Sequence, residues 1–165
     1  MLWQKDIVMT ISTKRSIKRL SAAILVLGGL TLAYIYVQMV SQLWLDNMDP
    51  INWNPEIYGW QIFIIAGRFV GLTLLYLMSW IFIRRTVRGL DDGDYFPECN
   101  ITLIRWAALV AALLAFVHSN YGAVVKGESE LMLDSNAILM PLIVLLFAGL
   151  YKMASLAAKD SRLAI

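Results

Sequence analysis

Arg68 is a permanent cation inside the otherwise apolar stretch of residues 62–83, where it lies between Gly67 and Gly71. A charged side chain near the centre of a bilayer costs about 3 kcal/mol on insertion scales, so an arginine in such a stretch is a candidate functional residue. Its guanidinium group attracts anions and donates hydrogen bonds to polar groups. Arg68 is therefore the starting point for any chemistry in this chain.

Polar side chains of other apolar segments fall near the depth of Arg68. Counted at helical rise from the tryptophan that flanks the same segment, Arg68 and Gln38 lie about 12 Å and 9 Å below the outer boundary, and His118 lies about 18 Å above the inner one. Asn120 and Tyr121 follow His118 in the sequence. We therefore expect Gln38, Arg68, His118, Asn120 and Tyr121 to form a ligand-binding polar cluster in the outer leaflet.

A plainer interpretation stands beside each of these residues. The long side chain of Arg68 could reach towards the headgroups. His118 could be a simple hydrogen-bonding partner, and Gln38 and Asn120 could join helices through hydrogen bonds worth about 0.6 kcal/mol each. No carboxylate accompanies Arg68 within the apolar segments, which argues against a proton relay. The sequence leaves open whether Arg68 lines a cavity or reaches the headgroups.

Gly67 and Gly71 form a Gly-x-x-x-Gly pair on one face of the predicted helix. Such a pair lets another helix backbone approach closely and pack by van der Waals contact. Ala107, Ala111 and Ala115 form a similar small-residue stripe in the third apolar segment. We expect the glycines to pack against this stripe, with a homodimer contact as the alternative.

The elements that position these residues are four long apolar segments. The chain has 165 residues, of which 59% are hydrophobic and 16% charged, and its mean hydropathy is +0.66. About 20 apolar residues are enough for a helix to cross a bilayer. The sequence therefore predicts an all-α membrane protein, a bundle of four transmembrane helices in one domain over residues 1–165. The predicted spans are residues 20–42, 60–83, 103–125 and 137–157.

Basic residues are distributed unequally among the segments that flank these spans. Cytoplasmic loops of membrane proteins carry an excess of Lys and Arg. One set of flanking segments contains Lys5, Lys14, Arg15, Lys18, Arg19, Arg84, Arg85, Arg88, Lys159 and Arg162. The other two loops contain only Lys126. The sequence therefore places both termini and the middle loop in the cytoplasm, with residues 1–19 as a basic amino-terminal segment.

The sequence lacks the residues that several classes of chemistry require. The chain has one cysteine, Cys99, and one histidine, His118, so it cannot form an internal disulfide or a His-rich metal site. No nucleophile elbow, zinc-protease motif or phosphate loop is present. The 14 basic and 12 acidic residues nearly balance, which argues against direct nucleic-acid binding. We expect no catalytic residues, no metal and no cofactor.

The middle loop and the carboxy-terminal tail carry a family resemblance. The pattern consists of Gly93, Tyr95, Phe96, Glu98, Asn100, Leu103 and Arg105, together with the ending "LAAKDSRLAI". It resembles an uncharacterised family of small bacterial four-helix integral membrane proteins. Members of that family are often encoded beside a small Cro/CI-type helix-turn-helix regulator, and they have no agreed biochemical activity. The resemblance implies the four-helix architecture and suggests a cytoplasmic regulator as a partner.

These observations favour a non-enzymatic sensing or interaction protein of the bacterial inner (plasma) membrane, linked to a transcriptional regulator. One alternative is a small transporter or channel subunit in which Arg68 lines a polar vestibule. Another is an immunity or envelope-stress protein. The expected partners are the lipid bilayer, the helix-turn-helix regulator and, as an alternative, further copies of the chain.

Overall fold

The computed structural model describes residues 11–44 and 51–163, and its regular elements there are all helical. Residues 1–10 of the predicted basic segment and residues 164–165 of the tail pattern lie outside the described residues. The helices are α1 (Ile11–Trp44), α2 (Tyr58–Asp92), α3 (Cys99–Val125) and α4 (Ser135–Leu163). Each is long and apolar enough to cross a membrane. The prediction of an all-α chain with four helices long and apolar enough to span a membrane is confirmed for the described residues.

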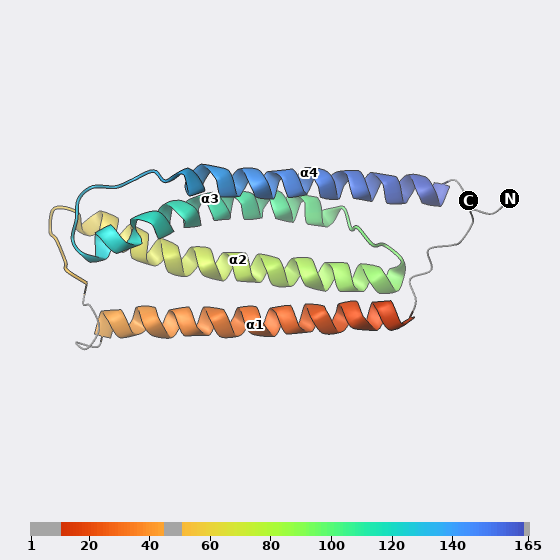
Figure 1. Cartoon of the computed structure of the whole chain (residues 1–165), viewed down its shortest axis with the longest axis horizontal. Coiled ribbons are helices and arrows are strands. Elements are labelled where there is room, and N and C mark those ends of the chain that lie inside the picture. Colours follow the sequence, from red (N-terminus) through yellow and green to blue (C-terminus); the bar gives the residue numbers. More distant parts are fainter. Residues whose placement is uncertain (1–10, 45–50, 164–165) are drawn as a thin grey trace.

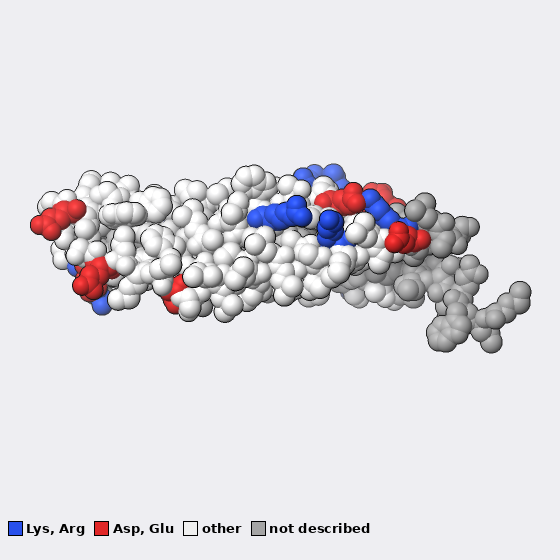
Figure 2. All heavy atoms as spheres, turned by 90° about the horizontal axis from the view of Figure 1, so that it is seen from above, with Lys and Arg blue, Asp and Glu red and all other residues white. Residues whose placement is uncertain are grey.

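Successive helices run in opposite directions, so α1 begins, α2 ends, α3 begins and α4 ends at the same end of the molecule (Figure 1). We call this the basic end, because ten of the described Lys and Arg side chains belong to segments at or next to it. Lys and Arg gather towards it on the face shown in Figure 2. The opposite end is called the amide end, because the side chains of Asn52, Asn54 and Gln61 form hydrogen bonds there.

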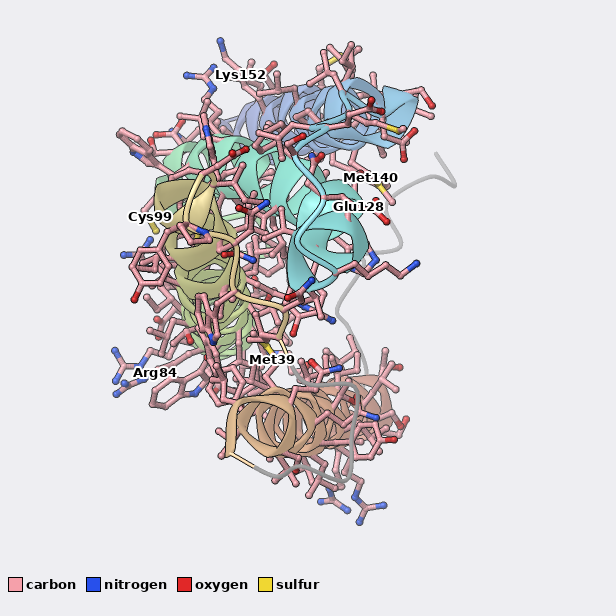
Figure 3. The ribbon with its side chains drawn as sticks, turned by 90° about the vertical axis from the view of Figure 1, so that its left-hand side faces the viewer. Met39, Arg84, Cys99, Glu128, Met140 and Lys152 are labelled. Carbon is pink, nitrogen blue, oxygen red and sulfur yellow. The ribbon has the colours of Figure 1, made fainter. Side chains whose placement is uncertain are left out.

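The four helices form an open row in chain order. Backbone contacts join α1 to α2, α2 to α3 and α3 to α4 among the described residues. Seen from the amide end, α1 and α4 lie at the two extremes of the row (Figure 3). An open row leaves many large apolar side chains exposed, as suits helices surrounded by lipid.

All four helices extend further at the basic end than the predicted spans, and α1 and α2 extend the furthest. Helix α1 already begins at Ile11, within the basic segment, and α2 continues from residue 84 to Asp92 through what the hydropathy predicts as loop. Arginine and lysine are good helix formers, and no proline interrupts either stretch. Helix α2 ends only where Gly93 adopts a left-handed conformation with φ of 75°.

The Gly-x-x-x-Gly pair of α2 does face α3. A Cβ atom added to Gly67 would lie 3.1 Å from Val117 Cγ2, and one added to Gly71 would lie 3.1 Å from Leu114 Cδ1. The α3 side chains nearest to the glycines are therefore Val117 and Leu114, in place of the predicted alanine stripe. Branched side chains fill the space that the missing Cβ atoms leave.

Helix α1 is attached to α2 mainly through side chains. Met39 is its one buried hydrophobic residue in the described chain and packs near Ile65. The Tyr36 hydroxyl donates to the Phe69 carbonyl oxygen at 3.0 Å. The Tyr76 hydroxyl of α2 donates to the Leu25 carbonyl oxygen at 3.2 Å. Two tyrosine hydroxyls and one methionine thus carry much of the α1–α2 contact.

The α2–α3 turn folds back tightly against the last turn of α2. Gly89 is buried, and a Cβ atom added to it would overlap the Asp94 carbonyl oxygen and lie 3.1 Å from Pro97 Cγ. Because the overlapping atom belongs to the backbone, no side-chain movement can relieve the clash. Only glycine fits at this position.

We predict that Gly89→Ala lowers the free energy of unfolding by about 2 kcal/mol, because the added methyl group overpacks the turn. Gly149→Ala is the matched control, since Gly149 has no neighbour within 4 Å of an added Cβ atom. In a helix interior the control should gain up to about 1 kcal/mol. Unfolding of both variants in mixed micelles, followed by circular dichroism, measures the difference. Equal stability of the two variants would contradict the close contact at Gly89.

Candidate functional site

Arg68 stacks on an aromatic ring of the neighbouring helix. Its Cζ atom lies 4.0 Å from the ring centroid of Tyr121 in α3. A cation over an aromatic face is stabilised by roughly 0.5–2 kcal/mol, more when water is excluded. The Tyr121 hydroxyl in turn donates a 2.6 Å hydrogen bond to Gln42 Oε1 in α1. Tyr121 therefore connects α1, α2 and α3 at one level.

The aromatic ring offers Arg68 an intramembrane partner that is not a carboxylate. Within the part of the chain that the structure describes, no Asp or Glu pairs with Arg68. Arg68 is partly buried, so its charge is shared between the Tyr121 ring and the surroundings of the helix. The cation therefore has a partner within the protein, the aromatic ring of Tyr121.

Gln38 and His118 do not share this contact in the structure. Gln38 is exposed, and its Nε2 atom donates to the Tyr34 hydroxyl of the same helix at 2.8 Å. Gln42, one turn further along α1, is the amide that reaches Tyr121. His118 is also exposed, and it forms no hydrogen bond or ion pair with the described residues.

Asn120 is buried and binds the α3–α4 connection. Its Nδ2 atom donates to the Phe116 and Met132 carbonyl oxygens, each at 2.8 Å. Its Oδ1 atom accepts from the Met132 backbone N–H at 2.6 Å. These bonds use the amide group to fix a chain segment, so Asn120 has a structural role here. Of the five residues predicted as one cluster, the structure brings Arg68 and Tyr121 into direct contact.

A cluster of amide side chains at the amide end, formed by Asn52, Asn54 and Gln61, is not singled out by the sequence. Gln61 is fully buried, and its Nε2 atom donates to the Asn52 and Val124 carbonyl oxygens at 2.8 and 3.0 Å. Its Oε1 atom accepts from the Asn54 backbone N–H at 3.0 Å. The one signal in the sequence is an amide side chain placed directly after Trp60 at the start of an apolar run.

The same cluster closes the carboxyl end of α3. The last carbonyl groups of a helix have no partner within the helix. Asn52 donates from its backbone N–H to the Val125 carbonyl oxygen at 2.9 Å and from Nδ2 to that of Lys126 at 3.1 Å. Asn54 Nδ2 donates to the Gly127 carbonyl oxygen at 3.0 Å. Asn52 and Asn54, which precede α2, therefore serve as a cap for α3.

Asn100 forms a second buried polar cluster at the basic end. It is fully buried, and its Nδ2 atom donates to Thr86 Oγ1 at 3.2 Å and to the Tyr151 hydroxyl oxygen at 3.1 Å. It thus joins α2, α3 and α4. Its Oδ1 atom has no hydrogen-bond partner. An unpaired buried acceptor is uncommon in folded proteins and calls for a specific explanation.

An apolar cavity of about 740 Å³ adjoins this cluster. Its lining residues belong to α2, α3 and α4, with Phe96 from the α2–α3 turn and Ile24 from α1. Tyr151, the partner of Asn100, is among the lining residues. Other aromatic residues of the lining are Phe82, Phe96 and Phe147. The volume falls within the range of about 300–1,000 Å³ that is typical of small-molecule sites.

The described residues contain no group of three or more His, Cys, Asp and Glu that could hold a metal ion. Cys99, the one cysteine, is exposed. The polar groups that contact one another between the helices at the amide end and around Arg68 are amides, hydroxyls and the guanidinium group of Arg68. Such groups can bind a ligand or a neighbouring helix by hydrogen bonding and by cation–π contact.

Comparisons with family models, with curated proteins and with solved structures found no match to this chain. The resemblance carried by the middle loop and the tail therefore stays a prediction. The class that the fold defines is an all-α chain whose four described helices are each long and apolar enough to cross a membrane.

We predict that Gln61→Leu lowers the free energy of unfolding by about 2–3 kcal/mol, because it leaves a buried backbone N–H and two carbonyl groups without their partner. Gln38→Leu is the control, since Gln38 is exposed and bonds only to Tyr34 of its own helix. That variant should change the stability by less than about 0.5 kcal/mol. Thermal unfolding in detergent compares the two. A Gln61→Leu protein as stable as the control would show that the cap is unimportant.

Proposed function

We propose that this chain is a multi-pass protein of the bacterial inner membrane that acts without catalysis, as an interaction protein. Both termini lie in the cytoplasm, and the basic end binds a cytoplasmic partner. The concentration of Lys and Arg at one end supports this orientation through the positive-inside rule. The family resemblance suggests that the partner is a helix-turn-helix regulator.

The observation that carries the proposal is the length of α1 and α2. They contain 34 and 35 residues, or about 50 Å each at helical rise, while the hydrocarbon core is about 30 Å thick. Exposed Trp60 and Trp80 of α2 are separated by about 30 Å, the spacing expected of two interfacial tryptophans. The remaining part of α2, after Trp80, therefore projects beyond the membrane at the basic end.

The projecting part presents cations that protein carboxylates leave free. Lys18 pairs with Asp91 of α2 at 2.7 Å, which ties α1 to α2 in this region. Arg15 and Arg19 are exposed one turn apart on the same face of α1, and neither pairs with an acidic side chain of the described chain. A projecting helix pair with free arginines suits a partner that has an acidic surface.

The orientation predicts which side of the membrane exposes Cys99. Cys99 is an exposed residue at the basic end, so a membrane-impermeant maleimide should label it in inverted vesicles and leave it unlabelled in intact spheroplasts. The control is Cys99→Ser combined with Glu128→Cys, because Glu128 is exposed at the amide end. The control should show the opposite pattern. Labelling of Cys99 in spheroplasts only would reverse the proposed orientation.

If the proposed partner binds the projecting arginines, its capture by this chain should depend on their charge. Detergent-solubilised chain should recover a cytoplasmic helix-turn-helix protein, and Arg15→Glu with Arg19→Glu should reduce its recovery at least ten-fold by reversing the charge of the projecting face. Lys126→Glu, at the amide end, is the control and should leave the recovery unchanged. Quantitative mass spectrometry of the captured proteins measures both effects.

Two results would contradict this function. One is the absence of any such regulator from captures made under all growth conditions. The other is equal recovery by the double arginine variant and by the Lys126→Glu control, which would show that the projecting arginines are not the contact.

A further inference from the structure

We propose that a small cationic pocket between α1 and α2 binds the phosphate group of an anionic phospholipid at the basic end. Its lining residues are Lys14, Arg15 and Lys18 of α1 and Asp91 of α2, and its volume is about 240 Å³. The site rests on the membrane insertion proposed above and does not depend on the cytoplasmic partner. The charges of the pocket, its depth and its size each restrict the ligand.

The pocket brings together more positive charge than its carboxylate can neutralise. Both carboxylate oxygens of Asp91 accept hydrogen bonds from Lys18 Nζ, at 2.7 and 2.8 Å. Lys14 and Arg15 lie one turn before Lys18 on α1, and neither forms an ion pair with a described carboxylate. Like charges at this spacing repel each other along a helix. An anion bound between them relieves that repulsion, so the pocket favours a negatively charged ligand.

Lys14 distinguishes this pocket from an ordinary basic surface. It is partly buried, whereas the other three lining residues are exposed. A partly buried charge is screened by water and salt less than an exposed one, so it attracts an anion more strongly. An ammonium group can donate three hydrogen bonds, and that of Lys14 donates none to the described residues. The pocket therefore contains a cation with its hydrogen-bonding capacity unused.

The depth of the pocket matches the headgroup layer at the basic end. Lys18 precedes Leu20, where the apolar run of α1 begins, by about 3 Å at helical rise, and Lys14 precedes it by about 9 Å. On α2, Asp91 lies about 10 Å beyond Arg84, where that helix leaves its apolar region. The polar layer outside the hydrocarbon is about 5–8 Å thick on each side. The pocket therefore lies at the level of lipid phosphate groups, where basic pockets between helices bind lipid heads.

The size and the lining of the pocket select the head of a lipid and not its chains. All four lining residues are charged, so the pocket offers an alkyl chain no apolar contact. Its volume is below the range of about 300–1,000 Å³ that is typical of drug-sized ligands. The unesterified oxygens of a phosphate group accept charge-assisted hydrogen bonds from Lys14 and Arg15. A choline or ethanolamine head brings its own cation, so the lining favours a phospholipid with an uncharged alcohol on its phosphate.

The test measures lipid binding to the full chain in a non-ionic detergent by native mass spectrometry. The probes are dioleoyl phosphatidylglycerol, which is anionic, and dioleoyl phosphatidylcholine, which has the same acyl chains and a cationic head. At equal concentration, we expect the unmodified chain to retain the first lipid roughly ten-fold more than the second. Glycerol 3-phosphate offers a similar phosphate group without acyl chains. A large excess of it should not displace the lipid, whose chains also contact the apolar faces of the helices.

Two cations of α1 provide matched variants. Lys14 lines the pocket, whereas Arg19 is exposed on the same helix and is not part of the lining. Lys14→Gln should reduce the binding of phosphatidylglycerol about five-fold, and Arg19→Gln should change it less than about two-fold, although each variant removes one positive charge. Lys14→Arg keeps the charge and should retain the binding. This variant and the lipid ratio of the unmodified chain decide the question if Lys14→Gln fails to fold.

Three results would overturn the site. Equal retention of the two lipids by the unmodified chain would exclude a preference for an anionic lipid. Equal binding by Lys14→Gln and Arg19→Gln would exclude the pocket, because attraction to a basic surface in general does not distinguish the two positions. Displacement of the lipid by glycerol 3-phosphate would reassign the pocket to a soluble phosphate.

Two controls separate these results from the proposed function. Lys14→Gln should leave the recovery of the cytoplasmic partner unchanged, because that partner is expected to bind Arg15 and Arg19. Flotation of the chain with phosphatidylglycerol vesicles after an alkaline wash measures membrane insertion by itself. A chain that floats but shows no lipid preference overturns the pocket alone. A chain that does not float overturns the membrane insertion on which both proposals rest.

Discussion

The fold depends on buried amide side chains that complete the hydrogen bonding of backbone groups and hydroxyls. Hydrocarbon offers no water to an unpaired N–H or C=O group, so every polar group at membrane depth needs a partner within the protein. Gln61 supplies such partners at the amide end, Asn120 fixes the α3–α4 connection, and Asn100 joins three helices at the basic end. Each is almost completely excluded from solvent. The apolar faces alone would define no register between helices.

The same constraint explains how Arg68 is accommodated. A cation in this region needs a partner, and an aromatic ring provides one at a smaller desolvation cost than a second buried charge would impose. The ring face of Tyr121 contacts Arg68, and its hydroxyl group donates a hydrogen bond to Gln42. Tyr121 thus uses both its aromatic ring and its polar group. The arginine thereby contributes to the contact among three helices, where an isolated charge would weaken it.

The number of helices follows from hydropathy, because a run of about 20 apolar residues has few alternatives to a membrane-crossing helix. The ends of the helices do not, since Arg84 to Asp92 are helical in spite of their polarity. The contact between Arg68 and Tyr121 lies within the group predicted from depth alone. Choosing Gln42 over Gln38 requires the rotation of α1 relative to α2, which depends on the packing of Met39 and Tyr36 and has no signature in hydropathy. The roles of Gln61 and Asn100 also have no signal in the sequence, because most of their partners are backbone and hydroxyl groups distant in the sequence.

The position of α1 at one extreme of the row has a consequence for cooperativity. Every hydrogen bond made by the three buried amides joins residues within 51–163, and α1 takes part in none of them. Helices α2 to α4 therefore form one unit of local stability, and α1 forms a second unit that rests on a few side-chain contacts. Separation of α1 from α2 would break the Tyr121–Gln42 and Lys18–Asp91 contacts and none of the bonds of the buried amides. The first helix thus lies outside the network of buried amide bonds that joins the other three helices.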